Sequence, residues 1–225
     1  MINYRDMINQ NVIVASKKIN KYIRRTPFER SAMISDLIGA DVWLKMENQQ
    51  HTGSFKFRGA INKMLALSES ERESGIYAAS TGNHGAAVAY ACQLLKVPCI
   101  IYVPENSSEA KLINMKNFGA EIVVHGKDCM DGELKAREVA NNTGGIYLSP
   151  YNDLEVVVGQ GTIGKEIESQ CNGLDSIIVS VGGGGLISGV GGYLKSIWPD
   201  IEIIAASPEN HAVMIKSLDA GEIIK

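Results

Sequence analysis

Short β-branched runs alternate with longer helical segments along almost the whole chain. The expected strands are residues 40–47, 75–80, 98–104, 120–126, 145–150, 176–182 and 201–208. The segments between them carry apolar residues at helical spacing, as Ala87, Ala91 and Leu94 do. This alternation predicts an α/β protein with mostly parallel sheets flanked by helices. These are more strands than one small sheet holds, so we expect two lobes.

Composition excludes several classes of protein. Of the 225 residues, 45% are hydrophobic and 21% are charged, which is typical of a soluble globular chain. A net charge of -3 gives no electrostatic reason to expect nucleic acid or an anionic membrane as a partner. No apolar run approaches the roughly 20 residues that a membrane helix needs. The first residues lack the apolar region of a signal peptide, so we expect a cytoplasmic protein.

Metal and disulfide chemistry are not expected either. The four cysteines, Cys92, Cys99, Cys129 and Cys171, match no zinc pattern and no CxxC motif. The four histidines are scattered, and no two of them stand at metal-ligand spacing. We therefore interpret the cysteines as free thiols and predict no metal site.

Four consecutive glycines, Gly182 to Gly185, follow an apolar strand and precede a helix in "SVGGGGLISGV". Glycines in a row destabilise regular structure, but they let backbone N–H groups curl around an anion at a helix N-terminus. The segment lacks the GKS or GKT of a P-loop and the spacing of a dinucleotide fingerprint. It predicts a phosphate site, with a flexible strand-to-helix turn as the alternative.

A second polar turn lies between a strand and a helix in "ASTGNHGAAVAYA". Ser80, Thr81, Gly82, Asn83 and His84 offer hydroxyls, an amide and free N–H groups where the helix starts. Such a loop can bind a carboxylate. The alternative is an ordinary N-cap built from one of these side chains, with His84 in a structural role.

Lys56 stands just inside a helix start, in "TGSFKFRGAINKML", where partial positive charge disfavours a cation. Its small and apolar neighbours predict a packed environment that favours the neutral amine, and a neutral amine can form a Schiff base. The alternative is a surface lysine. A phosphate cradle, a carboxylate loop and a nucleophilic lysine together indicate an aldehyde cofactor with a phosphate arm, which is pyridoxal 5'-phosphate.

Four blocks carry a resemblance to a known family: "KMENQQHTGSFKFRGA", "STGNHGAAVAYA", "SPYNDLEVVVGQGTIGKEI" and "SVGGGGLISGV". In this order they resemble the serine/threonine dehydratases, fold-type II pyridoxal-phosphate enzymes that include serine racemase. The resemblance implies that Lys56 is the catalytic Schiff-base lysine and that Asn83 contacts the cofactor ring hydroxyl. It also implies which residues bind the cofactor phosphate and which receive the substrate carboxylate. The phosphate-binding residues are Gly182, Gly183, Gly184, Gly185 and Leu186. The loop that receives the substrate carboxylate is Ser80, Thr81, Gly82, Asn83 and His84.

The resemblance also implies a domain organisation. Residues 1–47 and 148–225 form the large lobe, which binds the cofactor phosphate, and residues 48–147 form the small lobe. Family members continue past the position of Lys225, so the large lobe is expected to be incomplete at the C-terminus. The remainder would supply the residue that faces the pyridine nitrogen. Apolar surface left open by an incomplete lobe favours association, and we expect a homo-oligomer, specifically a dimer.

The function implied is that of an ammonia-lyase, or dehydratase, which converts L-threonine or L-serine to a 2-oxo acid and ammonia. One alternative is a serine racemase-like reaction or another β-elimination on an amino acid. Thr81 stands where serine racemase has a serine, and its methyl group restricts the hydroxyl. A further alternative is an inactive, truncated fragment that binds the cofactor. Ser207 and Val213 replace the carboxylates of the family's metal site, which again predicts no metal.

Overall fold

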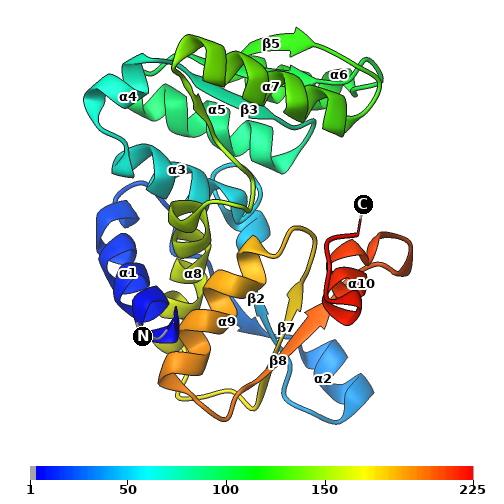
Figure 1. Ribbon diagram of the computed structural model, residues 1–225. Helices are drawn as coiled ribbons and strands as arrows, with labels where there is room; N and C mark the ends of the chain where they lie inside the picture. The colour runs from blue at the N-terminus through cyan, green and yellow to red at the C-terminus, as the bar shows by residue number, and fades with distance from the viewer. Residues whose placement is uncertain (1–3, 225) are drawn as a thin grey trace.

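The computed structural model describes residues 4–224, in which helices surround three separate sheets (Figure 1). The α-helices are α1 (Tyr4–Ile19), α2 (Ala32–Ile38), α3 (Lys56–Ala66), α4 (Glu69–Glu73), α5 (Asn83–Leu95), α6 (Glu109–Asn117), α7 (Cys129–Thr143), α8 (Leu154–Glu168), α9 (Gly185–Ile197) and α10 (Val213–Ala220). The strands are β1 (Phe28–Arg30), β2 (Trp43–Lys45), β3 (Ile76–Ala79), β4 (Cys99–Val103), β5 (Glu121–Val124), β6 (Ile146–Tyr147), β7 (Ser176–Ser180) and β8 (Glu202–Ala206). Short 3-10 helices cover Glu47–Gln49 and Glu209–His211.

The largest sheet is parallel and has the strand order β5-β4-β3-β6. Successive side chains of a strand point to opposite faces, and β3 shows this directly. Ile76 and Ala78 join the core cluster that contains α5, whereas Tyr77 and Ala79 pack against Ala136 and the rest of α7. Helices therefore cover both faces, as a parallel sheet requires.

The remaining strands form two small sheets. β7 and β8 pair in parallel, and one face of this pair packs against a core built from α1, α8 and α9. β1 and β2 pair antiparallel, with Glu29 opposite Leu44. Among the described residues, none of the helices combines the length and the apolar character that crossing a membrane requires.

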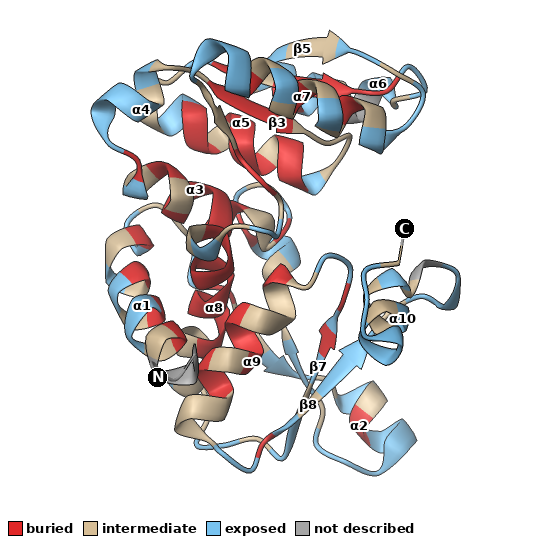
Figure 2. Ribbon diagram, in the orientation of Figure 1, coloured by how far each residue is buried: buried red, intermediate tan, exposed pale blue. Residues whose placement is uncertain are grey.

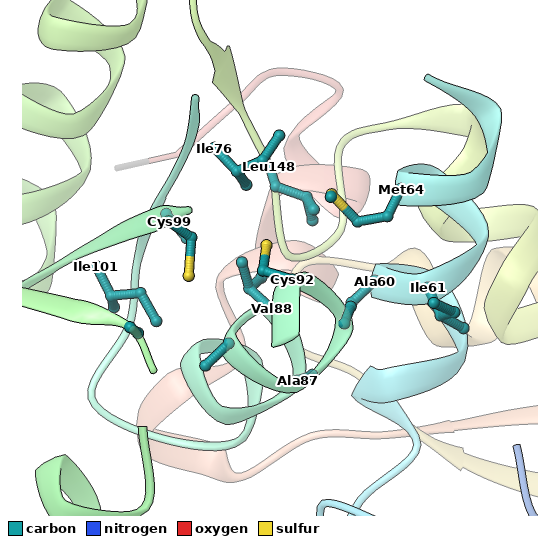
Figure 3. Close-up of a cluster of buried hydrophobic side chains, with 14 of the residues drawn as sticks. Ala60, Ile61, Met64, Ile76, Ala87, Val88, Cys92, Cys99, Ile101 and Leu148 are labelled. Atoms are coloured by element: carbon teal, nitrogen blue, oxygen red, sulfur yellow. The ribbon is translucent and has the colours of Figure 1, made fainter. Parts of the chain in front are cut away.

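Helix α3 lies between α5 and α8 and connects the sheet core to the second core. Its buried face contributes Phe57, Ala60, Ile61 and Met64 to a cluster that reaches Val88 on α5. Figure 3 shows Ala60 and Met64 on the side of α3 that faces Cys92 and Leu148. On its other side α3 approaches α8 so closely that both helices need glycine. A β-carbon on Gly59 would lie 2.3 Å from Gln160 Nε2, and one on Gly159 would lie 2.6 Å from Arg58 O.

The α/β class expected from the sequence is confirmed, and each expected strand range contains an observed strand. The sequence reading missed β1, whose three residues, Phe-Glu-Arg, include two charged ones. Helix α6 begins without a side-chain cap. Ser108 occupies the cap position but makes no capping bond, and Ser107 donates to Pro104 O instead. The division into lobes at residues 48 and 147 stays a prediction.

The close approach of α3 and α8 generates a stability prediction. Gly159→Ala should lower the free energy of unfolding by about 2 kcal/mol, because the two nearest atoms that its methyl group meets, Arg58 O and Gly59 Cα, are backbone and cannot swing away. Gly132→Ala in α7 is the matched control. Its β-carbon would meet nothing nearer than 3.7 Å, so that alanine should leave the chain unchanged or up to about 1 kcal/mol more stable. Urea denaturation measures both, and equal effects would contradict this account of the packing.

Candidate active site

Residues 148–151, which connect β6 to α8, contact all three segments that the sequence singled out. The carbonyl oxygen of Leu148 accepts a hydrogen bond from His84 Nε2 at 2.9 Å. The carbonyl oxygen of Pro150 accepts one from Lys56 Nζ, also at 2.9 Å. The ring of Tyr151 lies against Gly183, since a β-carbon there would fall 2.2 Å from Tyr151 Cγ. The lysine, the polar turn and the glycine loop therefore border one region.

Lys56 is the first residue of α3, as the sequence predicted, and it is half-buried. Burial lowers the pKa of its amine. Within residues 4–224 no carboxylate forms an ion pair with it, so no opposite charge offsets this lowering, and its bond to Pro150 O anchors the amine. The amine also lies 5.3 Å from the centre of the Phe55 ring. Such an amine loses its proton more readily than a surface lysine and can act as a nucleophile or a base.

The polar turn after β3 leads into α5 without a side-chain cap. Gly82 occupies the N-cap position, and the hydroxyl of Ser80 accepts a bond from Gly82 N at 3.1 Å. The alternative of an ordinary N-cap from Ser80, Thr81 or Asn83 is therefore wrong. The first N–H groups of α5, at Asn83 and His84, have no partner within the helix and can bind an anion. The side chain of Asn83 is exposed beside them.

The imidazole of His84 faces inward and is only 5% exposed. A carbonyl can only accept, so the bond to Leu148 O shows that Nε2 carries the hydrogen. The pKa of His84 is lowered to about 4, mainly because the ring is buried. The hydrogen bond to Leu148 O raises this pKa, and the nearby charge of Lys56 lowers it further. The ring is thus neutral near pH 7 and fixes the turn to residues 148–151, while the backbone of His84 remains the part that can meet a ligand.

The glycine loop has the features of an anion cradle. Gly182 and Gly183 are exposed, and open space lies where Gly182 would carry a β-carbon. Gly184 has φ +82°, a left-handed conformation that favours glycine, and no side chain caps α9 after it. The N–H groups of Gly185 and Leu186 begin that helix. A phosphate group fits this donor set, with Tyr151 filling the space on the other side of the loop.

A charged network that was not predicted from the sequence lies beside Lys56. Arg58 is fully buried, with bonds of 2.8 Å to Glu47 Oε1 and 2.7 Å to Glu166 Oε1. Lys45 Nζ lies 2.6 Å from Glu166 Oε2. Burial alone would raise the pKa of Glu166, but bonds to Arg58 and Lys45 overcome it and hold that pKa below its ordinary value. The only sign of this network in the sequence was an arginine among small and apolar residues, and no pattern identified its partners.

The contacts of residues 148–151 were not predicted from the sequence. The ring of Tyr151 packs on Gly183 and its backbone on Gly185. Burial raises the pKa of its phenol. The contacts at Leu148 and Pro150 use backbone carbonyls, which no side-chain motif reveals.

Comparison with known proteins places this geometry in a family. Residues 19–225 match the family model described as pyridoxal-phosphate dependent enzyme. The chain is similar to L-threonine ammonia-lyase of Thermotoga maritima, with 39% identity over 212 residues, which is 94% of this chain and 53% of that protein. It is similar to a catabolic L-threonine dehydratase of Staphylococcus aureus, with 43% identity over 204 residues, which is 90% of this chain and 59% of that protein.

Solved structures give the same result. Maize serine racemase superposes with a TM-score of 0.92 and 36% identity, over 96% of this chain and 66% of that one. A processed threonine deaminase isoform from Solanum lycopersicum superposes with a TM-score of 0.93 and 34% identity, over 98% of this chain and 61% of that one. The chain spans between about half and two thirds of the length of these relatives. The resemblance to dehydratases and serine racemases is confirmed, and the chain belongs to the family of pyridoxal-phosphate dependent enzymes.

Proposed function

We propose that this chain carries the catalytic core of an ammonia-lyase that converts L-threonine or L-serine to a 2-oxo acid and ammonia. The observation that carries the proposal is the environment of Lys56: a half-buried amine held on Pro150 O beside the glycine loop, with no carboxylate partner among the residues that the structure describes. The relatives named threonine ammonia-lyase and threonine dehydratase support the choice of reaction.

The residues that would hold the cofactor divide by chemistry. Lys56 would supply the covalent attachment, and Asn83 would contact the ring hydroxyl. The glycine loop would hold the phosphate through backbone N–H groups at the start of α9, with Leu186 as its last residue. When bound, the cofactor supplies an electron sink that stabilises negative charge at the α-carbon of an amino acid.

The chain's own residues would do the rest of the work. The turn of Ser80, Thr81, Gly82, Asn83 and His84 would receive the substrate carboxylate, with uncapped N–H groups as donors. The amine of Lys56, once free, would take the α-proton, a role that its lowered pKa favours at neutral pH. Pro150 O would keep that amine oriented by accepting one of its hydrogens. His84 would stay neutral and hold the turn in place.

Two other functions remain candidates. The likeness to maize serine racemase supports a racemase, and Thr81 is the residue that argues against it, because its methyl group narrows the space around its hydroxyl. A fragment that binds the cofactor without turnover is the other candidate, for a chain that spans 53% to 66% of the length of these relatives.

Lys56 can be tested as the attachment point without any activity assay. Purified chain incubated with pyridoxal phosphate should gain a visible absorbance band. Borohydride reduction and peptide mapping should then place the adduct on Lys56, because burial makes this amine the most nucleophilic at the site. Lys56→Ala should lose the band. Lys116→Ala, which removes an exposed lysine of α6, is the control and should keep it. An adduct spread over surface lysines would overturn the assignment.

Product analysis distinguishes the three functions. With pyridoxal phosphate present, L-threonine and L-serine should yield 2-oxo acid and ammonia in equal amounts, at a rate at least about 1,000-fold above that of Lys56→Ala, because this variant lacks the base. D-serine should not accumulate, and Thr81→Ser should increase any that forms. D-serine without 2-oxo acid would favour the racemase. No product from chain that has the adduct on Lys56 would favour the binding fragment.

The buried histidine makes stability depend on pH. Its folded pKa of about 4 lies below the unfolded value of 6.5, so the unfolded chain binds more protons in this window and stability falls as pH falls through it. From about pH 7 to about pH 5, His84 should account for a loss of about 2 kcal/mol in the free energy of unfolding. His84→Gln, which keeps a donor but cannot titrate, should lose this part of the slope. His125→Gln, at an exposed position, should retain it. Urea denaturation at both pH values measures the difference, and equal slopes would refute the assignment.

A further inference from the structure

Two of the four cysteines meet in the core beside the largest sheet. Cys92 lies in the last turn of α5 and Cys99 is the first residue of β4, and both are free thiols. Val97 N donates to Cys92 O at 2.9 Å, so the chain turns back directly after α5 and brings the start of β4 beside it. Figure 3 shows both sulfur atoms in the part of the core where α5 packs on β4, among apolar side chains such as Ile76. Two thiols from neighbouring elements therefore share one place in the core.

The two thiols are hydrogen-bonded to each other. This bond and burial raise the pKa of the Cys92 thiol, whereas the same bond lowers the pKa of Cys99 although burial opposes it. Cys92 is thus the donor and keeps its hydrogen, and Cys99 is the sulfur that becomes a thiolate first. The thiolate is the form of cysteine that reacts as a nucleophile.

Cys99 is also the thiol that lies nearer to solvent. It lines a surface cavity of about 310 Å³ at the starts of β3, β4 and β5, together with small or rigid residues such as Gly75, Pro98 and Gly119. Cys99 is 5% exposed, whereas Cys92 is 1% exposed and does not line this cavity. Figure 2 shows α5 and β3 buried over most of their length. A small oxidant that enters the cavity therefore meets Cys99 before Cys92.

The other two cysteines are placed differently. Cys129 is exposed at the first position of α7, and Cys171 Sγ lies 3.4 Å from Ile167 O. A buried free cysteine on its own behaves as a small apolar residue. Cys92 and Cys99 differ from that case because a sulfur with a lowered pKa borders a cavity and has a second sulfur in contact with it. Reversible thiol oxidation uses this combination of a reactive and a resolving cysteine.

We propose that Cys92 and Cys99 form an oxidation site, which a hydroperoxide converts to a disulfide. The Cys99 thiolate attacks one oxygen of the peroxide, so that a sulfur–oxygen bond forms, the oxygen–oxygen bond breaks and the other oxygen leaves as an alcohol or water after taking a proton. Cys92 then attacks the sulfenic acid on Cys99. The sulfur–sulfur bond forms, and the hydroxyl group leaves as water with the Cys92 proton. Two thiols are oxidised and one peroxide is reduced. This inference goes beyond the proposed function and needs neither cofactor nor substrate.

The disulfide can be detected by mass in a chain that retains only this pair. Cys129→Ser combined with Cys171→Ser removes the other two thiols. Hydrogen peroxide should then lower the mass of the folded chain by about 2 Da, and dithiothreitol should restore it. Trypsin cuts after Lys96, between the two cysteines, so their peptides should stay joined in the oxidised chain and separate on reduction.

Two further substitutions in this background distinguish the roles of the two sulfurs. Cys92→Ala leaves Cys99 without a resolving thiol, so that chain should gain about 32 Da as the sulfinic acid forms. Cys99→Ala should leave Cys92 unmodified, because this thiol keeps its hydrogen and does not line the cavity. The two variants are matched, since each removes one buried sulfur, and a general loosening of the core would affect both alike.

Three results would overturn the proposal. One is a pair that stays reduced in the folded chain at a peroxide concentration that oxidises the exposed Cys129 of the unaltered chain, which would make Cys92 and Cys99 inert core residues. Another is equal oxidation of the two alanine variants. The third is joined peptides that form only in urea, or only in a dimer on a non-reducing gel. If an alanine variant fails to fold, the peptides of the chain that retains both thiols decide the question alone.

Discussion

The buried guanidinium of Arg58 is the interaction on which the arrangement of the site depends. It bonds Glu47, before α3, and Glu166, near the end of α8, so three segments distant in sequence meet at one side chain. Lys45 joins the second carboxylate from β2. Burying these charges costs free energy, so the network stabilises the fold only when it is complete. Removing one member leaves an unpaired buried charge and lowers the free energy of unfolding by about 3–5 kcal/mol. Arg58 follows Lys56 by two residues, so the network also fixes where α3 begins.

Backbone contacts between helices carry this constraint to the other parts of the site. Helix α8 meets α3 through Gly159 and α9 through Gly161, whose β-carbon would lie 3.0 Å from Gly189 O. On the α9 side Gly189 is equally restricted, since its β-carbon would lie 2.2 Å from Val157 O. Helices this close cannot slide or rotate without collision. The start of α3, with Lys56, and the start of α9, with the glycine loop, are therefore held in a fixed relation through α8.

The parts of the candidate site that depend on local composition could be proposed from the sequence. Lys56 at a helix start, four glycines after a strand and a polar turn after β3 are each visible within a dozen residues. Prediction failed where the physics is non-local. Glu166 lies 108 residues from Arg58 in sequence, and no pattern links them. The carbonyls of Leu148 and Pro150 act through backbone, which is the same at every residue. The short strand β1 has only one residue that favours a sheet, Phe28, and its pairing with β2 is a contact that its own three residues do not reveal.

The position of Lys56, unfavourable for a cation, follows from how three helices meet. Helix α3 begins at Lys56, α5 at Asn83 and α9 at Gly185, and each start contacts residues 148–151 directly or through an adjacent residue. The N-terminus of a helix carries about half a positive charge, so this region favours anions and disfavours a protonated amine. Burial of Lys56 acts in the same direction. One arrangement thus brings two helix N-termini, after the turn and after the glycine loop, to the same region as an amine whose pKa burial lowers, which is what the proposed function requires. A fold that placed the lysine at the other end of α3 would lose both effects together.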